Sequence, residues 1–556
     1  MQKLSRLALL ALASTAVAQS NAVAGMDGWL TNIQSLTYYG RRGSAHPNGE
    51  IGMAFANTMC NPGSVEIPWF AAMQEDHPKF SFIMTRETNG RMVQINDWRS
   101  YLKHAFTSVN VNGACGTCAG SSAGGSKMGL NCSDTYGASN NGDRYWLGPP
   151  EEVDPFLGTW ESTGSWFDLA GNPANPSDGV RTLTSTIVSS WGDSVRNRLT
   201  VKEQDFLVPN SKFFYGIQLI HQGEPMANRA NNIASRGFVP TWNGTTWSFS
   251  TTGQVGFTQN TVLSHWTGAS VSSAYNGSGT TSSTIYDGKF YVAVKVTGPV
   301  NGKWHYEYAV QNYDNMRGAV IFALPVCDSA QVTNLGFRDL DSDALNDWTV
   351  QRANGELRFL AGANNKLRWN NIFNFWFDSD AAPVSGQVVL HEDLLAQPAV
   401  GQPALAPLPA GFETVRVNSS VPGFVPVVDL GAGCGTNAPS LYATSMPSVG
   451  NTGFNLQVSA TPNANLFAFY AFGTGSTQVG PNCFQYLDSA TSGTYGFMQA
   501  DAAGLANIPL PIPATVTPFD LSWQAVQLVP GAGAVLGDFN LSNGVKVRVG
   551  ATSGCN

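Results

Sequence analysis

The chain has 556 residues, of which 12% are charged, and its 30 basic and 38 acidic residues give a net charge of -8. This balance argues against a nucleic-acid partner, and no run beyond the N-terminal segment is apolar for long enough to span a membrane. The 59 Gly, 30 Pro, 15 Trp and 30 Phe favour strands and tight turns over helices.

The chain begins with a segment typical of a secretory signal peptide. Lys3 and Arg6 precede an apolar run at 7–13, and small residues follow at 16–18. The run is too short to cross a bilayer, so we expect cleavage after Ala18, with Ala24 as the alternative site, and a secreted, extracellular or cell-surface product.

Export makes disulfides the expected state of the eight cysteines. Two even groups occur along the chain: Cys60, Cys115, Cys118 and Cys132, then Cys327, Cys434, Cys483 and Cys555. The spacing of Cys115 and Cys118 also suits a redox pair or half a zinc site, but its glycine-rich flanks are typical of a loop. We expect structural disulfides, with the pairing of Cys327 and Cys555 left open.

Strand patterns dominate the order of predicted elements. Residues 98–106 are the best candidate for a short helix, and 108–150, dense in Gly, Ser and Asn, predict a long disulfide-tied loop. The alternation of β-branched and aromatic residues predicts strands at 182–188, 289–296 and 304–310. Asn301-Gly302 between the last two favours a hairpin.

Composition divides the chain into parts. After the signal peptide at 1–18 we expect a large β-rich region at 25–395, divided, if at all, near residue 170. A proline-rich linker follows at 396–426, and 427–556 predict a C-terminal β-sandwich. The predicted fold class is mainly β: a large antiparallel N-terminal region with long disulfide-tied loops, then a smaller sandwich.

Motifs at both ends resemble a known group of proteins. The run Gly433–Leu441, Cys483, the late strand from Trp523 and the closing Leu541-Ser-Asn-Gly resemble a sandwich module of uncharacterised secreted, multi-domain β-rich proteins of environmental bacteria. Asp76-His-Pro78 and Cys115-Gly-Thr-Cys118 are similar to the leading region of such proteins. The resemblance implies an architecture and no activity.

Three residues of the N-terminal region could carry chemistry. His77, His104 and Asp134 offer two imidazoles and a carboxylate, a set that zinc, copper or iron can use. They are the candidate catalytic residues of an alternative function, a secreted metal-dependent hydrolase or oxidase. No spacing fixes two of them on one helix face, so structural roles at a turn and a helix end are the competing interpretation.

An acidic run suggests calcium. Asp339, Asp341, Asp343 and Asp347 occupy relative positions 1, 3, 5 and 9, as ligands do in calcium loops. Ala344 replaces the usual turn glycine and position 12 is not acidic, so a solvated acidic turn is the alternative. Calcium is the expected cofactor, and zinc or copper is the alternative.

Aromatic residues suggest carbohydrate contact. Most tryptophans should fill the core, but Trp146, Trp242 and Trp247 fall in predicted loops, where flat rings can stack on sugars. The sequence therefore predicts an extracellular structural or binding protein, stabilised by calcium, with extracellular polysaccharide or other surface proteins as partners.

Overall fold

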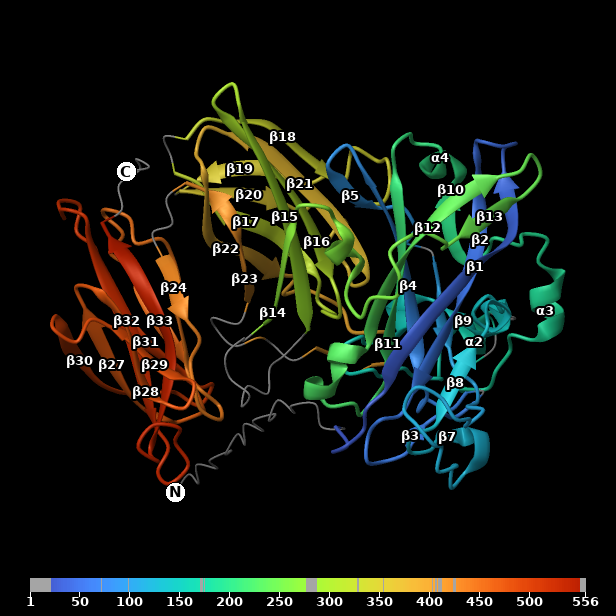
Figure 1. Cartoon of the computed structure of the whole chain (residues 1–556), viewed down its shortest axis with the longest axis horizontal. Helices are drawn as coiled ribbons and strands as arrows, with labels where there is room; N and C mark the ends of the chain where they lie inside the picture. Colours follow the sequence, from blue (N-terminus) through green and yellow to red (C-terminus); the bar gives the residue numbers. More distant parts are fainter. Residues whose placement is uncertain are drawn as a thin grey trace, which may run out of the picture.

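A computed structural model describes residues 22–550, except 72, 99, 171–173, 175, 277–287, 328–329, 354, 403, 406–407, 409–412 and 424–426. The predicted signal peptide at 1–18 and Cys555 lie outside the described residues. Figure 1 shows three β-rich domains arranged in chain order, from blue and green through yellow to red. None of the described helices is long and apolar enough to cross a membrane.

The N-terminal domain consists of two antiparallel sheets. Its strands are β1 (Trp29–Gly43), β2 (Gly49–Cys60), β3 (Ile67–Pro68), β4 (Lys79–Thr88), β5 (Arg91–Gln94), β6 (Leu102–His104), β7 (Lys127–Met128), β8 (Ser133–Tyr136), β9 (Leu147–Gly148), β10 (Leu199–Lys202), β11 (Lys212–Ile220), β12 (Ile233–Trp242) and β13 (Trp247–Ser250). One sheet has the order β1-β2-β10, with β8 on β2, and the other has the order β13-β12-β11-β4-β6-β9, with β5 on β4. The Phe55 ring lies 4.7 Å from that of Tyr215 and 5.1 Å from that of Phe82, so aromatic packing joins the sheets.

Short helices connect these strands. They are α1 (Ala138–Asn141), α2 (Trp166–Leu169), α3 (Ser185–Ser190) and α4 (Glu203–Phe206), with 3-10 turns η1 (Gly124–Ser126), η2 (Arg144–Trp146), η3 (Pro150–Glu152), η4 (Met226–Asn231) and η5 (Val262–His265).

The middle domain also has two antiparallel sheets around one core. Its strands are β14 (Ser270–Tyr275), β15 (Lys289–Val300), β16 (Lys303–Asn312), β17 (Ala319–Pro325), β18 (Val332–Arg338), β19 (Thr349–Ala353), β20 (Glu356–Leu360), β21 (Asn371–Ser379), β22 (Pro383–Glu392) and β23 (Thr414–Pro422). The sheet orders are β14-β15-β16-β21-β18 and β19-β20-β17-β22-β23. The predicted hairpin is confirmed: β15 pairs with β16, and Asn301 and Gly302 take the positive φ of a tight turn.

The C-terminal domain packs a larger sheet on a smaller one. Its strands are β24 (Val427–Gly431), β25 (Ser440–Ala443), β26 (Asn455–Ser459), β27 (Asn465–Ala471), β28 (Thr474–Gly480), β29 (Cys483–Leu487), β30 (Ser492–Gln499), β31 (Leu505–Pro509), β32 (Phe519–Leu528) and β33 (Phe539–Val549). The sheet β24-β33-β32-β27-β30 faces β25-β26-β31 across a core that contains Trp523, 2% exposed. The predicted mainly β, antiparallel fold class is confirmed.

Disulfides tie down the loops, as expected. Cys60 pairs with Cys115, and Cys118 pairs with Cys132, so the predicted loop is fastened to the end of β2. Cys434 pairs with Cys483 in the C-terminal domain. Cys327 is also disulfide-bonded.

Two local predictions are wrong. Residues 98–106 do not form a helix, because Leu102–His104 pair as β6 between β4 and β9. Residues 182–188 are not a strand, because Thr184 caps the helix α3 by accepting a hydrogen bond from the Ile187 N–H. Strand pairing between distant segments overrides the helical pattern at 98–106, and helix capping overrides the strand pattern at 182–188.

The domain boundaries also differ from the sequence prediction. The core of the N-terminal domain draws on residues 26–249 and that of the middle domain on 290–421, so no boundary falls near 170. The predicted linker contains β23, whose Val415, Val417 and Val421 are fully buried. Ala399 is 2% exposed, so this part of the linker also packs against the protein.

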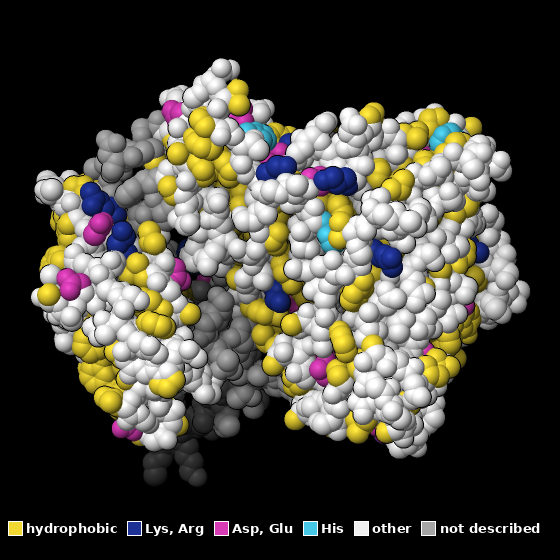
Figure 2. Space-filling model, viewed as in Figure 1, with side chains coloured by type: hydrophobic (Ala, Val, Ile, Leu, Met, Phe, Trp, Pro, Cys, Tyr) yellow, Lys and Arg dark blue, Asp and Glu magenta, His cyan; other side chains and the backbone are white. Residues whose placement is uncertain are grey.

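Low charge is visible on the surface. The face drawn in Figure 2 has few charged side chains, and hydrophobic side chains are scattered among uncharged polar side chains and backbone. Recognition at such a surface depends on shape and neutral hydrogen bonds more than on net charge.

Candidate functional site

A groove of about 820 Å³ lies between the N-terminal and middle domains. One wall includes Trp98 and Glu151 of the N-terminal domain, and the other includes Asp341, Asn364 and Arg368 of the middle domain. Residues of the predicted linker, from Leu395 to Val400, also line it. Its volume lies within the range of sites that bind small molecules or short oligomers.

Trp98 is the exposed aromatic residue of this groove. It lies between β5 and β6, and 53% of its surface is exposed. Covering the exposed half of this ring with a ligand would be favourable in proportion to the apolar area removed from water. The indole therefore offers a flat face on which the C–H face of a sugar can stack.

The opposite wall is built by the acidic turn after β18. The Asp341 N–H donates to Asp339 Oδ1 at 3.0 Å, and the Asp343 N–H donates to Asp341 Oδ1 at 2.7 Å. Asn365 Nδ2 donates to Asp339 Oδ2 at 2.6 Å, which fixes the turn to the neighbouring loop. These bonds hold carboxylate and amide groups at the groove.

Two ion pairs border the groove. Arg368 Nη1 lies 4.0 Å from Glu151 Oε1, so this contact joins the two domains, and Lys366 Nζ lies 2.9 Å from Asp393 Oδ2. Asp339 and Asp341 have no cationic partner within the described ranges. The lining therefore favours a neutral ligand with many hydroxyl groups over a polyanion.

The predicted histidine pair meets, but in the core. Nε2 of His77 lies 2.9 Å from Nδ1 of His104, and each residue is 1% exposed. Burial holds the pKa of both imidazoles well below the usual range, so both are neutral. Nδ1 of His77 lies 2.7 Å from the Gln74 carbonyl and must donate to it, so His77 Nε2 accepts from His104.

Asp134 does not complete a metal site with them. It lies on β8 opposite Met59, is 2% exposed, and burial raises its pKa to about 6. No group of three or more His, Cys, Asp or Glu residues in the described ranges is placed to hold a metal ion. The substrate of an enzyme could not reach His77 or His104 without opening the core.

The acidic turn satisfies much of its own hydrogen bonding. Besides the bonds given above, the Leu345 N–H donates to Asp343 Oδ1 at 3.1 Å. The pKa of Asp347 is raised, first by burial and then by the charges of Asp339, Asp341 and Asp343. The carboxylates are thus close enough to repel one another, and calcium binding stays a prediction.

None of the three predicted sugar-binding tryptophans lines the groove. Trp146 stacks on Phe106 at 5.2 Å, and Trp242 stacks on His46 at 4.2 Å. Trp247 is 4% exposed and its Nε1 donates to Glu203 at 2.9 Å, so this residue has no free face for a sugar. The sequence feature that indicates an exposed Trp98 is its polar surroundings, Asn96-Asp97 before it and Arg99-Ser100 after it.

Comparisons with known proteins give little. No protein-family model matches the chain, and no curated protein matches it. Among solved structures, BcpA, the major pilin subunit of Bacillus cereus, is 8% identical over 62% of this chain and 84% of its own, with a TM-score of 0.17. Alpha-2-macroglobulin of E. coli is 8% identical over 94% of this chain and 23% of its own, with a TM-score of 0.15. Scores this low carry no argument.

Proposed function

We propose that this chain is an extracellular binding protein whose groove between the N-terminal and middle domains holds a neutral polysaccharide. The observation that carries the proposal is the exposed indole of Trp98 beside amide and carboxylate side chains in an open groove. Stacking supplies affinity for the apolar face of a sugar, and planar polar groups select its hydroxyls.

The disulfides support the extracellular location. Three pairs are described, and disulfides persist in oxidising compartments. A structural role at the cell surface is compatible with three rigid β domains, in which the groove provides contact with the surrounding matrix.

Affinity electrophoresis tests the binding proposal. Native protein should be retarded in gels that contain soluble xylan, hydroxyethyl cellulose or galactan, and Trp98→Ala should lose most of that retardation. Trp242→Ala is the matched control, because this half-buried ring stacks on His46 away from the groove. Alginate, a polyanion, should give little retardation.

Equal retardation of native protein and Trp98→Ala would contradict the proposal. So would native protein that migrates freely in all three neutral gels.

A further inference from the structure

A second cavity, of about 440 Å³, lies between the middle and C-terminal domains. The sequence produces one wall of it by strand alternation. On β23, Val415 and Val417 are fully buried in the middle-domain core, so Arg416 between them points to the other face of the sheet. Arg416 is paired with Val389 on β22, and both line the cavity.

Arg416 forms no hydrogen bond or ion pair in the described part of the chain. Its Nε is sealed from solvent and makes no hydrogen bond, and none of the ion pairs involves it. Its guanidinium carbon lies 5.9 Å from the Tyr442 ring centre. Glu356 also lines the cavity, but its Oε2 is bound by Arg358 at 2.6 Å.

The buried Nε of Arg416 is costly to leave without an acceptor. Burial lowers the pKa of Arg416, against the opposing effects of Tyr442 and Glu356. A partly buried guanidinium with unused donors gains most from an acceptor with two oxygens in one plane. The carboxylate group has that geometry.

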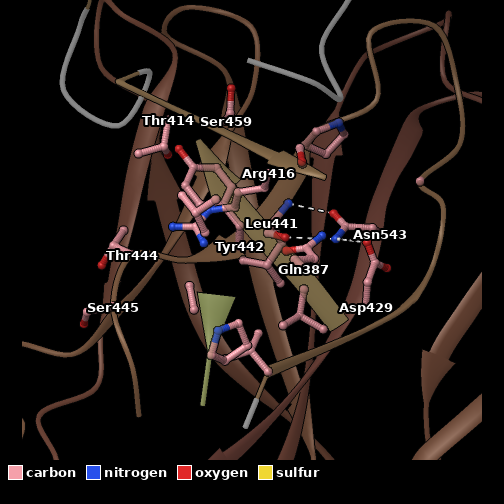
Figure 3. Close-up of a pocket in the computed structure, with 18 of the residues that line it drawn as sticks. Gln387, Thr414, Arg416, Asp429, Leu441, Tyr442, Thr444, Ser445, Ser459 and Asn543 are labelled. Carbon is pink, nitrogen blue, oxygen red and sulfur yellow. Dashed lines mark hydrogen bonds between the residues drawn. The ribbon is translucent and has the colours of Figure 1, made fainter. Parts of the chain in front are cut away.

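The wall opposite Arg416 limits the negative charge that a ligand can carry. Figure 3 shows Arg416 and Tyr442 on one side of the cavity and Asp429 and Asn543 on the other. Asp429 accepts a hydrogen bond from the Gly431 N–H at 3.0 Å, and burial raises its pKa. A dianion would be repelled by this second carboxyl, whereas a monoanion can keep its charge at Arg416.

Apolar side chains also line the cavity. Val389 belongs to the middle domain and Val427 to the C-terminal domain. We infer that the cavity is a binding site for a small organic monocarboxylate, whose carboxylate pairs with Arg416 and whose apolar body lies between the two domains. This site is separate from the proposed polysaccharide groove.

Thermal melting and calorimetry with benzoate and hexanoate test the site in the full chain. Both carboxylates should raise the melting temperature in a saturable way, because they bind the native state only. Benzyl alcohol and hexanol, which lack the carboxylate, should not. Sulfate should bind much more weakly, and equal protection by sulfate would overturn the choice of a monocarboxylate.

Variants of Arg416 separate binding from folding. Arg416→Gln should weaken benzoate binding about tenfold or more, and Arg416→Lys should weaken it less, since charge is kept but the planar fork is lost. Arg548→Gln is the control, because Arg548 is a C-terminal-domain arginine with its own partner, Asp520, at 3.2 Å. It should bind benzoate as the native protein does.

The ligand-free variant gives an independent readout. Arg416→Gln should melt close to the native temperature, because the lost cation makes no hydrogen bond or ion pair in the described part of the chain and only a distant ring contact with Tyr442. A lower melting temperature would show that the fold itself satisfies Arg416 and would overturn the proposal. So would unchanged benzoate binding by Arg416→Gln, or no saturable binding of either carboxylate to the native protein.

Discussion

Lys103 is a charged residue in a position where charge is costly. It is fully buried, its Nζ has no hydrogen-bond partner, and burial lowers its pKa to about 7. The rings of Phe106, Tyr136 and Trp146, at 4.8, 5.7 and 5.8 Å from Nζ, recover part of the cost through cation–π attraction.

The pH dependence of stability follows from this pKa. Between about pH 7 and the unfolded value of 10.5, the unfolded chain holds a proton on Lys103 that the native state has released. The free energy of unfolding should therefore rise with pH in this window, by up to about 1.4 kcal/mol per pH unit for this group.

Lys103→Met should flatten this rise and should be more stable than native protein near pH 7. Urea unfolding from pH 7 to 10 measures it, with the exposed Lys202→Met as control. Identical pH slopes for native protein and Lys103→Met would contradict the account.

Calcium is a second prediction at this scale. If the ion relieves repulsion among Asp339, Asp341, Asp343 and Asp347, calcium should raise the melting temperature relative to chelator, by mass action on the native state. Asp341→Asn should reduce the shift, whereas Asp488→Asn in the C-terminal domain should not. No difference between calcium and chelator would refute it.

At the residue scale, the sequence predicts which residue type a site uses better than it predicts which residue of that type is exposed. Loop position predicts that Trp247 is accessible to a sugar, but its Nε1 donates to the buried Glu203, 44 positions earlier in the chain. The sequence predicts a helix from Trp98, because no local pattern reveals that the following β6 pairs with β4 and β9. Exposure is a tertiary property.

At the scale of elements, the contact of β5 with β16 joins the first two domains. Arg91 on β5 forms two hydrogen bonds with Glu307 on β16, at 2.6 and 2.7 Å, and lies 3.6 Å from the Trp376 ring centre. Nε2 of His305 lies 3.3 Å from Oε2 of Glu307, and its Nδ1 lies 2.6 Å from Oδ1 of Asp378. A local hairpin was predictable from sequence, whereas this junction depends on residues more than 200 positions apart.

Loss of Arg91 should weaken the junction. Arg91→Met leaves Glu307, whose side chain is 4% exposed, without its main partner, so the free energy of unfolding should fall by about 2 kcal/mol. Arg352→Met, which removes contacts within the middle domain only, is the comparison for domain separation. Small-angle scattering should show a larger radius only for Arg91→Met; equal radii for both would contradict the junction's role.

The pKa of His305 adds a pH dependence to this junction. It is raised, first by its hydrogen bond to Glu307, so the stabilisation is complete below about pH 6.5 and is lost as pH rises through the folded pKa. Since the imidazole is partly exposed, the effect should be small. His305→Gln should remove it from the urea midpoint measured between pH 5 and 8, and an unchanged pH profile would contradict it.

At the scale of the whole molecule, the chain consists of three cores, two of which were predictable as one region. The C-terminal sandwich was evident from its low charge and regular short strands, and it has its own core and disulfide. The two larger domains share one composition, so only their separate sheets distinguish them. Both cavities lie between domains and depend on residues from distant segments.

The C-terminal domain should fold alone. A fragment of residues 427–556 should give a cooperative unfolding transition, and replacement of Cys434 and Cys483 by Ala should lower its stability by about 2–4 kcal/mol. Circular dichroism during thermal melting measures both. A fragment without a cooperative transition would show that the domain depends on its neighbour.

Hydrogen exchange with and without cellohexaose tests the central claim most directly. Bound cellohexaose should slow exchange on both walls of the groove, in the segments around Trp98, Asp341 and Arg368, and should change nothing around Trp242 or in the C-terminal domain. Slowing confined to the Trp242 region or to the C-terminal domain, or no slowing at saturating cellohexaose and xylohexaose, would contradict it.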